Sequence, residues 1–298
     1  MAIIVNTNMS ALKTQGNLTN ATNSLSSSLE RMSTGYKINS AKDDAAGLYV
    51  ATGLTTQIRG SKIALSNVST GSNVLNTVEG DLDTMLDNLN RIRDLANQAA
   101  NGIYDEDAQN AMLSEVNARL AEIDRVSASS NFNGLKLLDG SNTELKDNGL
   151  RLQVGANADA DANAIYVTGV FDQIDSTTLG KDNGDDTFDA MSLKEAAKTA
   201  FSAASTAARY LKVVDKAIDT ISVNKSKIGA AENRLESAQA SLITTIENAT
   251  AAHSTIMDAD IAEESAEYTK SRILQQTSAS LLVQANALPS LALSLISS

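Results

Sequence analysis

One histidine and the absence of cysteine limit the chemistry that this sequence of 298 residues can support. Without cysteine there are no thiolate nucleophiles, disulfides or thiolate zinc ligands, and His253 has no second histidine with which to hold a metal. His253 also falls in a heptad row of mixed polarity, where a lone histidine is more often a tolerated polar residue than a ligand or a catalytic base. We therefore expect no catalytic residue and no enzyme activity.

Two acidic clusters are the remaining candidates for metal binding. Residues 159–170 open like a calcium loop, but alanine replaces the glycine required at the sixth position and valine replaces the glutamate at the twelfth. The second cluster, Asp258, Asp260, Glu263 and Glu264, precedes the last helical stretch, where negative charge favours a helix N-terminus. Since the sequence also has no glycine-rich phosphate loop, we expect neither a metal nor a cofactor.

Charge and composition exclude further classes of protein. The chain has 24 Lys and Arg against 36 Asp and Glu, a net charge of −12, whereas nucleic-acid binding requires a basic face. Only 3% of residues are aromatic, so a thick globular core is not expected. The start of the chain lacks the basic region of a Sec signal, and the apolar stretch 281–296 is interrupted too often to span a membrane. We predict no nucleic-acid or membrane partner.

Heptad patterns predict the elements that hold the remaining residues. From residue 211 on, one apolar row repeats every seven residues beside a mixed row that includes Lys225, Glu232 and His253. We expect one helix from a cap at Ser192 to about His253. Similar rows indicate helices near 18–32, 65–96 and 113–123, and short alternating runs at 135–138, 150–154 and 164–167 predict hairpin strands. The predicted fold is mainly α: an elongated rod of long antiparallel helices in a coiled-coil-like bundle, with small β-hairpins.

The middle of the chain differs from both helical arms. Residues 139–190 contain six glycines, 11 acidic and 3 basic residues, so most of the negative charge lies there. We interpret this segment as a short, solvated, acidic loop and hairpin stub.

The apolar residues near the two ends have no evident core of their own. Ile3, Ile4 and Val5 open the chain, Leu18, Leu25 and Leu29 follow in an early seam, and Leu274, Leu281 and Leu288 form a stripe with Ser278 and Ala285 near its end. An apolar end left in water is an aggregation liability. We expect these segments to be ordered by copies of the same chain or by a partner.

Several ordered motifs resemble bacterial flagellin. They are residues 4–8 (IVNTN), 30–35 (ERMSTG), 38–47 (INSAKDDAAG), 90–99 (NRIRDLANQA), 122–127 (EIDRVS), 131–134 (NFNG), 152–155 (LQVG), 273–276 (ILQQ) and 284–286 (QAN). The resemblance covers about residues 3–156 and 190–298 and thins in the acidic middle.

The resemblance implies a structural subunit that self-assembles into the flagellar filament for swimming motility. It implies export through the flagellar type III apparatus to an extracellular flagellum, and contacts with an export chaperone and with the filament cap and junction proteins. By analogy, residues 1–44 and 257–298 would form a terminal-helix domain that makes the filament core. Residues 45–138 and 191–256 would form a helical rod domain, and 139–190 the acidic stub. Leu18, Leu25, Leu29, Leu274, Leu281 and Leu288 are the expected assembly and chaperone contacts.

A receptor surface is a further implication of the same resemblance. The host's flagellin-sensing Toll-like receptor would contact Arg91, Leu95 and Glu115. Arg91 and Leu95 lie four residues apart on one helix face, which we expect to be exposed, and Glu115 joins them if the next helix folds back antiparallel. A solvated Arg91–Glu115 ion pair without a receptor role is the simpler alternative.

Two other functions remain as alternatives: a hook-filament junction protein or a secreted coiled-coil adhesin, and an enzyme with a site in the acidic middle. Junction proteins usually lack the full set of rod motifs, and an enzyme would need ligands that this chain does not contain.

Overall fold

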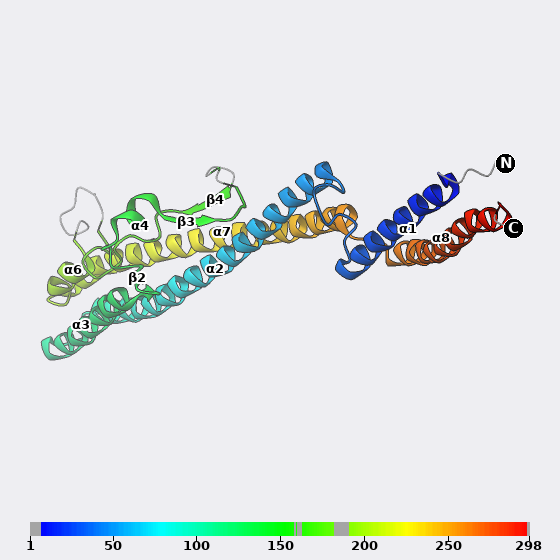
Figure 1. Ribbon diagram of the computed structural model, residues 1–298. Helices are drawn as coiled ribbons and strands as arrows, with labels where there is room; N and C mark the ends of the chain where they lie inside the picture. The colour runs from blue at the N-terminus through cyan, green and yellow to red at the C-terminus, as the bar shows by residue number, and fades with distance from the viewer. Residues whose placement is uncertain (1–6, 158, 160–162, 182–190, 297–298) are drawn as a thin grey trace. The chain divides into compact units, whose positions relative to one another are not determined.

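The computed structural model describes residues 7–157, 159, 163–181 and 191–296, with the side chains of α8 described as far as Ala287 (Figure 1). The described residues form seven helices and two antiparallel strand pairs, β1–β2 and β3–β4. In chain order the elements are α1 (Met9–Thr34), α2 (Ala45–Ala99), α3 (Glu106–Ser129), β1 (Asn131–Phe132), β2 (Leu135–Lys136), α4 (Thr143–Asn148), β3 (Leu150–Gln153), β4 (Ala164–Val167), α6 (Leu193–Ala200), α7 (Ala204–Met257) and α8 (Ile261–Ile296).

The chain divides into two compact units. Met1–Ile58 with Glu247–Ser298 forms one, here named the terminal unit, and Arg59–Ile246 forms the other, the central unit. The helices α2 and α7 contribute to both. Whether the three segments expected from the sequence behave as separate domains stays a prediction.

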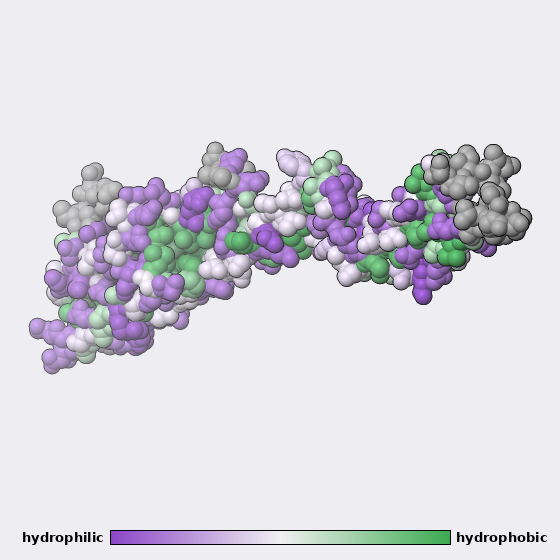
Figure 2. Space-filling model, in the orientation of Figure 1, coloured by the Kyte–Doolittle hydropathy of each residue, from purple (hydrophilic) through white to green (hydrophobic). Residues whose placement is uncertain are grey.

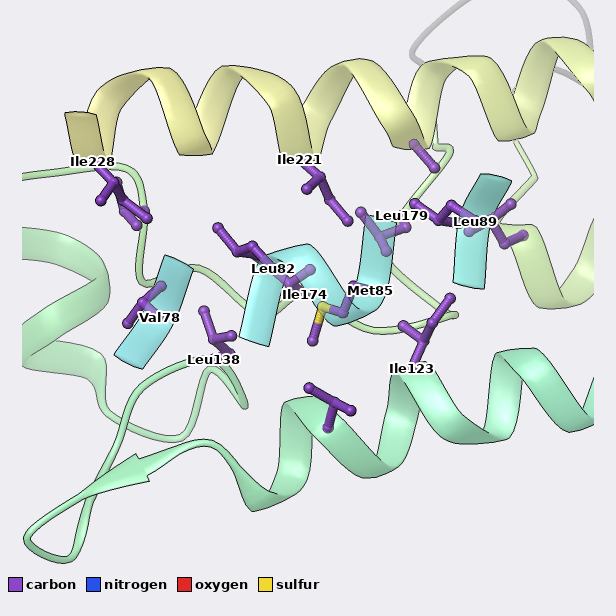
Figure 3. Packing of buried hydrophobic residues seen from close by; sticks show 14 of the residues in the cluster. Val78, Leu82, Met85, Leu89, Ile123, Leu138, Ile174, Leu179, Ile221 and Ile228 are labelled. Atoms are coloured by element: carbon purple, nitrogen blue, oxygen red, sulfur yellow. The ribbon is translucent and has the colours of Figure 1, made fainter. Parts of the chain in front are cut away.

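The core of the central unit is built from the predicted apolar rows. Figure 3 shows α2 residues such as Leu82 and Leu89 among side chains from α3 and α7, including Ile123 and Ile221, all of them fully buried. The α7 row is buried at every position from 214 to 242 that the heptad predicts: Val214, Ile221, Ile228, Leu235 and Leu242. Because each helix has a single wide apolar face, burial requires that the helices pack on one another. The predicted mainly α, coiled-coil-like packing of long helices with small hairpins is confirmed.

The segment 139–190 is more than a solvated stub. Its strands β3 and β4 pair in the register Leu150↔Val167 to Gln153↔Ala164, which confirms two of the predicted strands. Its buried side chains belong to the central core: Leu145, Leu152, Ile165, Val167, Val170, Phe171, Ile174 and Leu179. Leu152 lies so close to Gly71 of α2 that a Cβ there would fall 2.5 Å from its Cδ1. The expectation of a purely solvated module is therefore wrong for the described part of this segment.

The expected single helix from Ser192 to His253 is also wrong. Ser192 does cap a helix, in a reciprocal capping box with Glu195, but that helix is α6 and it ends at Ala200. The hydroxyls of Ser202 and Thr206 donate to the carbonyls of Thr199 and Ala200 at 2.7 and 3.0 Å, which satisfies the end of α6. Phe201 turns into the core, with its ring centroid 6.1 Å from that of Tyr210. The next helix, α7, begins at Ala204.

The mixed row of α7 places a poorly paired carboxylate beside α2. Lys225 pairs with Asp83 and Glu79, but Glu232, two turns later, has one buried oxygen with no hydrogen-bond partner among the described residues. Burial and the nearby Glu79 carboxylate raise the pKa of Glu232. A raised folded-state pKa means that this group favours folding below its unfolded pKa and loses that contribution as the pH rises through the folded value.

We expect Glu232→Gln to raise the melting temperature of the central unit at pH 7, because glutamine cannot ionise in this position. The gain should disappear below about pH 4, where the wild-type carboxyl is protonated in both states. Glu236→Gln, at an exposed position one turn later, is the matched control and should show no such pH-dependent gain. Calorimetry of wild type, Glu232→Gln and Glu236→Gln at pH 7 and below about pH 4 tests this expectation. If Glu232→Gln were no more stable than wild type at pH 7, the raised pKa of Glu232 would be contradicted.

Candidate functional site

The terminal unit pairs α1 with α8 through a seam of small residues. The two helices lie side by side (Figure 1) and are joined by hydrogen bonds from Asn8 to the carbonyl of Ala285 and from Gln275 to Thr22, at 2.7 and 3.1 Å. These contacts show that the helices are antiparallel. The buried seam positions recur every seven residues: Ala21 and Ser28 on α1, and Ser271, Ser278 and Ala285 on α8. Small residues at such a seam allow two helices to approach closely.

This seam leaves large apolar side chains facing away from the helix pair. Leu29, Leu274 and Leu281 are each 48% exposed, whereas Leu18 and Leu25 are half-buried. Leu288 lies in α8 beyond the described side chains. Figure 2 shows hydrophobic surface over the α1–α8 pair. Such a concentration of exposed apolar surface indicates a protein interaction site.

Further exposed apolar residues on the same pair were not predicted. They are Met9 and Leu12 on α1 and Ile273 and Val283 on α8, all more than half exposed. The stripe predicted near the end of the chain combined small and large residues of α8. The signal that separates them was present, because Ser271, Ser278 and Ala285 keep a strict seven-residue spacing of their own.

The second candidate surface lies on α2 and α3 of the central unit. The Arg91 Nε and Nη2 atoms donate to the two carboxylate oxygens of Glu115 at 2.8 and 3.2 Å, and Arg119 lies 3.8 Å from the same group. This bidentate pair confirms that α3 folds back along α2. Arg91 lowers the pKa of Glu115, chiefly through the hydrogen bond, so the pair contributes above the usual carboxylate pKa and is lost as the pH falls through the lowered value. Both side chains are substantially exposed, which keeps that contribution small.

Leu95 does not share this exposure. It is only 3% exposed and belongs to the core cluster, so the expectation that Arg91 and Leu95 form one exposed face is wrong. The buried face of α2 is wider than a single stripe because this helix packs against both α3 and α7. Arg93, which the sequence did not single out, pairs with Asp215 of α7 at 2.6 Å and marks the other edge of that face.

The described residues of the two acidic clusters do not converge on a metal centre. Asp260 accepts hydrogen bonds from the amides of Ala262 and Glu263 at the start of α8, as the helix-terminus interpretation predicted. No group of three or more His, Cys, Asp or Glu side chains suited to a metal occurs within the described ranges. Residue 161 of the calcium-like run lies outside them. In the described part of the chain, no helix is both long and apolar enough to cross a membrane.

Comparison with known proteins identifies the family. The helical N-terminal region of bacterial flagellin matches residues 5–143, and its helical C-terminal region matches residues 211–296. The chain is 36% identical to flagellin FlaB1 of Treponema pallidum, over 95% of this chain and 96% of that protein. It is 38% identical to flagellin of Bacillus subtilis, over 98% and 99% respectively. The chain belongs to the bacterial flagellin family.

The similarity to flagellar proteins extends over nearly the whole chain. A further relative, the flagellar filament 33 kDa core protein of Treponema phagedenis, is 34% identical over 99% of this chain and 100% of its own length. The chain is a structural subunit of the flagellar filament, and the junction-protein and adhesin alternatives are not favoured. The short acidic middle accords with the reduced central region expected from the sequence.

Proposed function

We propose that this chain polymerises through the outward apolar residues of its α1–α8 pair. The observation that supports the proposal is that this pair closes its own seam with small residues and leaves Leu29, Leu274 and Leu281 exposed. Burying these leucines against neighbouring copies would stabilise a helical polymer, since each fully buried leucine contributes about 1.5–3 kcal/mol. Leu18 and Leu25, half-buried in the single chain, would complete the contact together with Leu288.

The net charge predicts how this assembly depends on salt. Copies that each have a charge of −12 repel one another, and the screening length falls from about 30 Å at 0.01 M salt to about 10 Å at 0.1 M. We expect salt to promote polymerisation, and sulfate most strongly because it also favours apolar burial. Sedimentation and electron microscopy across a salt series would measure this, and assembly that is fastest without salt would contradict it.

Before assembly the same apolar residues need protection from water. We propose that an export chaperone covers the α8 stripe, that the chain leaves the cell through the flagellar type III apparatus, and that it then meets the filament cap and junction proteins. The exposed leucines of α8 support this proposal, because a free monomer with this surface would aggregate.

We further propose that Arg91 and Glu115 contribute to a surface for the host's flagellin-sensing Toll-like receptor. Both side chains are accessible in the single chain and their positions are fixed by two mutual hydrogen bonds. Arginine that is held rigidly and remains accessible is common among residues that dominate binding energy at interfaces. Leu95 would act only indirectly, by supporting the helix from within the core.

A further inference from the structure

The fully buried row of the seam between α1 and α8 does not by itself select one alignment of the two helices. Its buried positions are small on both helices and repeat every seven residues, as in Ala21 and Ser28 of α1 and Ser271 and Ser278 of α8. If α8 moved by seven residues along α1, small residues would again face small residues. Uniform heptads of this kind leave the register open unless a polar residue fixes it.

One charged residue interrupts the uniform row. Glu264 lies one heptad before Ser271, and its side chain is only 12% exposed. The Arg31 Nη1 atom donates to Glu264 Oε1 at 3.0 Å, while Oε2 is buried with no hydrogen-bond partner among the residues described. A buried carboxylate without a cation is strongly unfavourable. In the observed alignment Arg31 supplies the cation that Glu264 requires.

A backbone bridge lies directly beside the ion pair. The Lys37 amide donates to the carbonyl of Met257 at 2.7 Å, and the Ala259 amide donates to the carbonyl of Gly35 at 2.9 Å. Tyr36 and Asp258 form an antiparallel bridge between these two bonds. Gly35, at a φ of 75°, ends α1 in the left-handed conformation that this turn requires. These backbone bonds add to the ion pair where α1 ends and α8 begins, and the hydrogen bond from Gln275 to Thr22 follows further along the pair.

We propose that Arg31 and Glu264 are positioning residues that fix the register of α1 on α8. In that register the outward leucines of the two helices, such as Leu29 and Leu274, are presented at one fixed spacing. Any other alignment would change the apolar pattern that a second copy meets. The importance of register for assembly rests on the proposed function, whereas the register itself is a property of the single chain.

The absence of native cysteine allows a direct test by disulfide cross-linking. Thr22 contacts Gln275, so the pair Thr22→Cys with Gln275→Cys reports the observed register. Thr22→Cys combined with Tyr268→Cys or with Leu282→Cys reports a shift of one heptad in either direction. In the otherwise wild-type chain we expect the first pair to cross-link at least about tenfold more than either of the others.

Two substitutions of Glu264 should abolish this preference. Glu264→Lys places a second cation beside Arg31, and Glu264→Ser extends the row of small residues so that the seam still closes. We expect each to reduce the preference by about tenfold, and the exchange Arg31→Glu with Glu264→Arg to restore it. The seam is preserved in Glu264→Ser, so this variant decides the test if Glu264→Lys prevents the helices from pairing.

The proposal is overturned if Glu264→Ser keeps the wild-type preference, because the backbone bridge alone would then set the register. It is also overturned if Glu264→Ser forms none of the three cross-links, because the ion pair would then hold the helices together rather than align them. Cross-links are measured on the soluble chain and on sedimented polymer. If the wild-type chain does not sediment, the proposed assembly is contradicted. The proposed register is still tested by the cross-links of the soluble chain.

Discussion

Chains with the substitution Leu281→Asp are expected to form no filaments, while their central unit melts at the wild-type temperature. Leu281 belongs to the terminal unit and is 48% exposed in the single chain, so an aspartate is solvated there and costs little. Burial of the same aspartate against neighbouring copies would cost several kcal/mol if it stays unpaired. Because each subunit repeats the penalty, polymerisation should fail throughout the accessible concentration range. Sedimentation and electron microscopy measure filament formation, and calorimetry measures the melting temperature of the central unit.

Ser280→Asp is the matched control for Leu281→Asp. Ser280 is an exposed and already polar residue of α8, so this variant adds the same charge one residue away without removing an apolar side chain. We expect it to polymerise, with at most a higher salt requirement. Normal filaments from Leu281→Asp would show that this face of α8 is not an assembly contact. Equal loss in both variants would instead attribute the effect to charge alone.

Long rows of large apolar residues made much of the fold predictable from the sequence. The row from Val214 to Leu242 could be identified because branched apolar side chains that repeat every seven residues are stable in water only when they are buried against other helices. The break between α6 and α7 could not be found in this way. It depends on hydroxyls of Ser202 and Thr206 that reach specific carbonyls, and on the burial of Phe201, both of which exist only once the fold has formed.

The candidate surfaces, too, could be predicted only in part from the sequence. Hydropathy singled out Leu274 and Leu281 but not which way they face, because the α1–α8 seam uses serine and alanine as its buried residues. The ion pair Arg31–Glu264 joins residues 233 positions apart, a distance that no local pattern can bridge. Sequence periodicity therefore located the amphipathic helices, and tertiary packing decided which of their residues remain available to a partner.

Arg91 and Leu95 should have different roles although they lie one turn apart. We expect Arg91→Ala to reduce activation of the flagellin-sensing receptor by at least about tenfold, as for a central interface arginine, with little effect on folding or filament formation. Leu95→Ala should instead destabilise the central unit by about 2–5 kcal/mol, because it removes a leucine that is 3% exposed from the core. Receptor reporter assays and urea unfolding of the purified monomers separate the two effects.

Arg93→Ala is the matched control for Arg91→Ala. The two arginines are equally exposed and each pairs with one carboxylate, but Arg93 binds Asp215 of α7 whereas Arg91 binds Glu115 of α3. If the receptor contacts the α2–α3 face, only Arg91→Ala should lose activation, and Glu115→Gln should follow it because the guanidinium then loses its bidentate partner. Equal activation by wild type and Arg91→Ala would show that the receptor does not bind the α2–α3 face. Equal losses in both arginine variants would show the same. The proposed assembly surface lies on the other unit of the chain, so that result would not count against it.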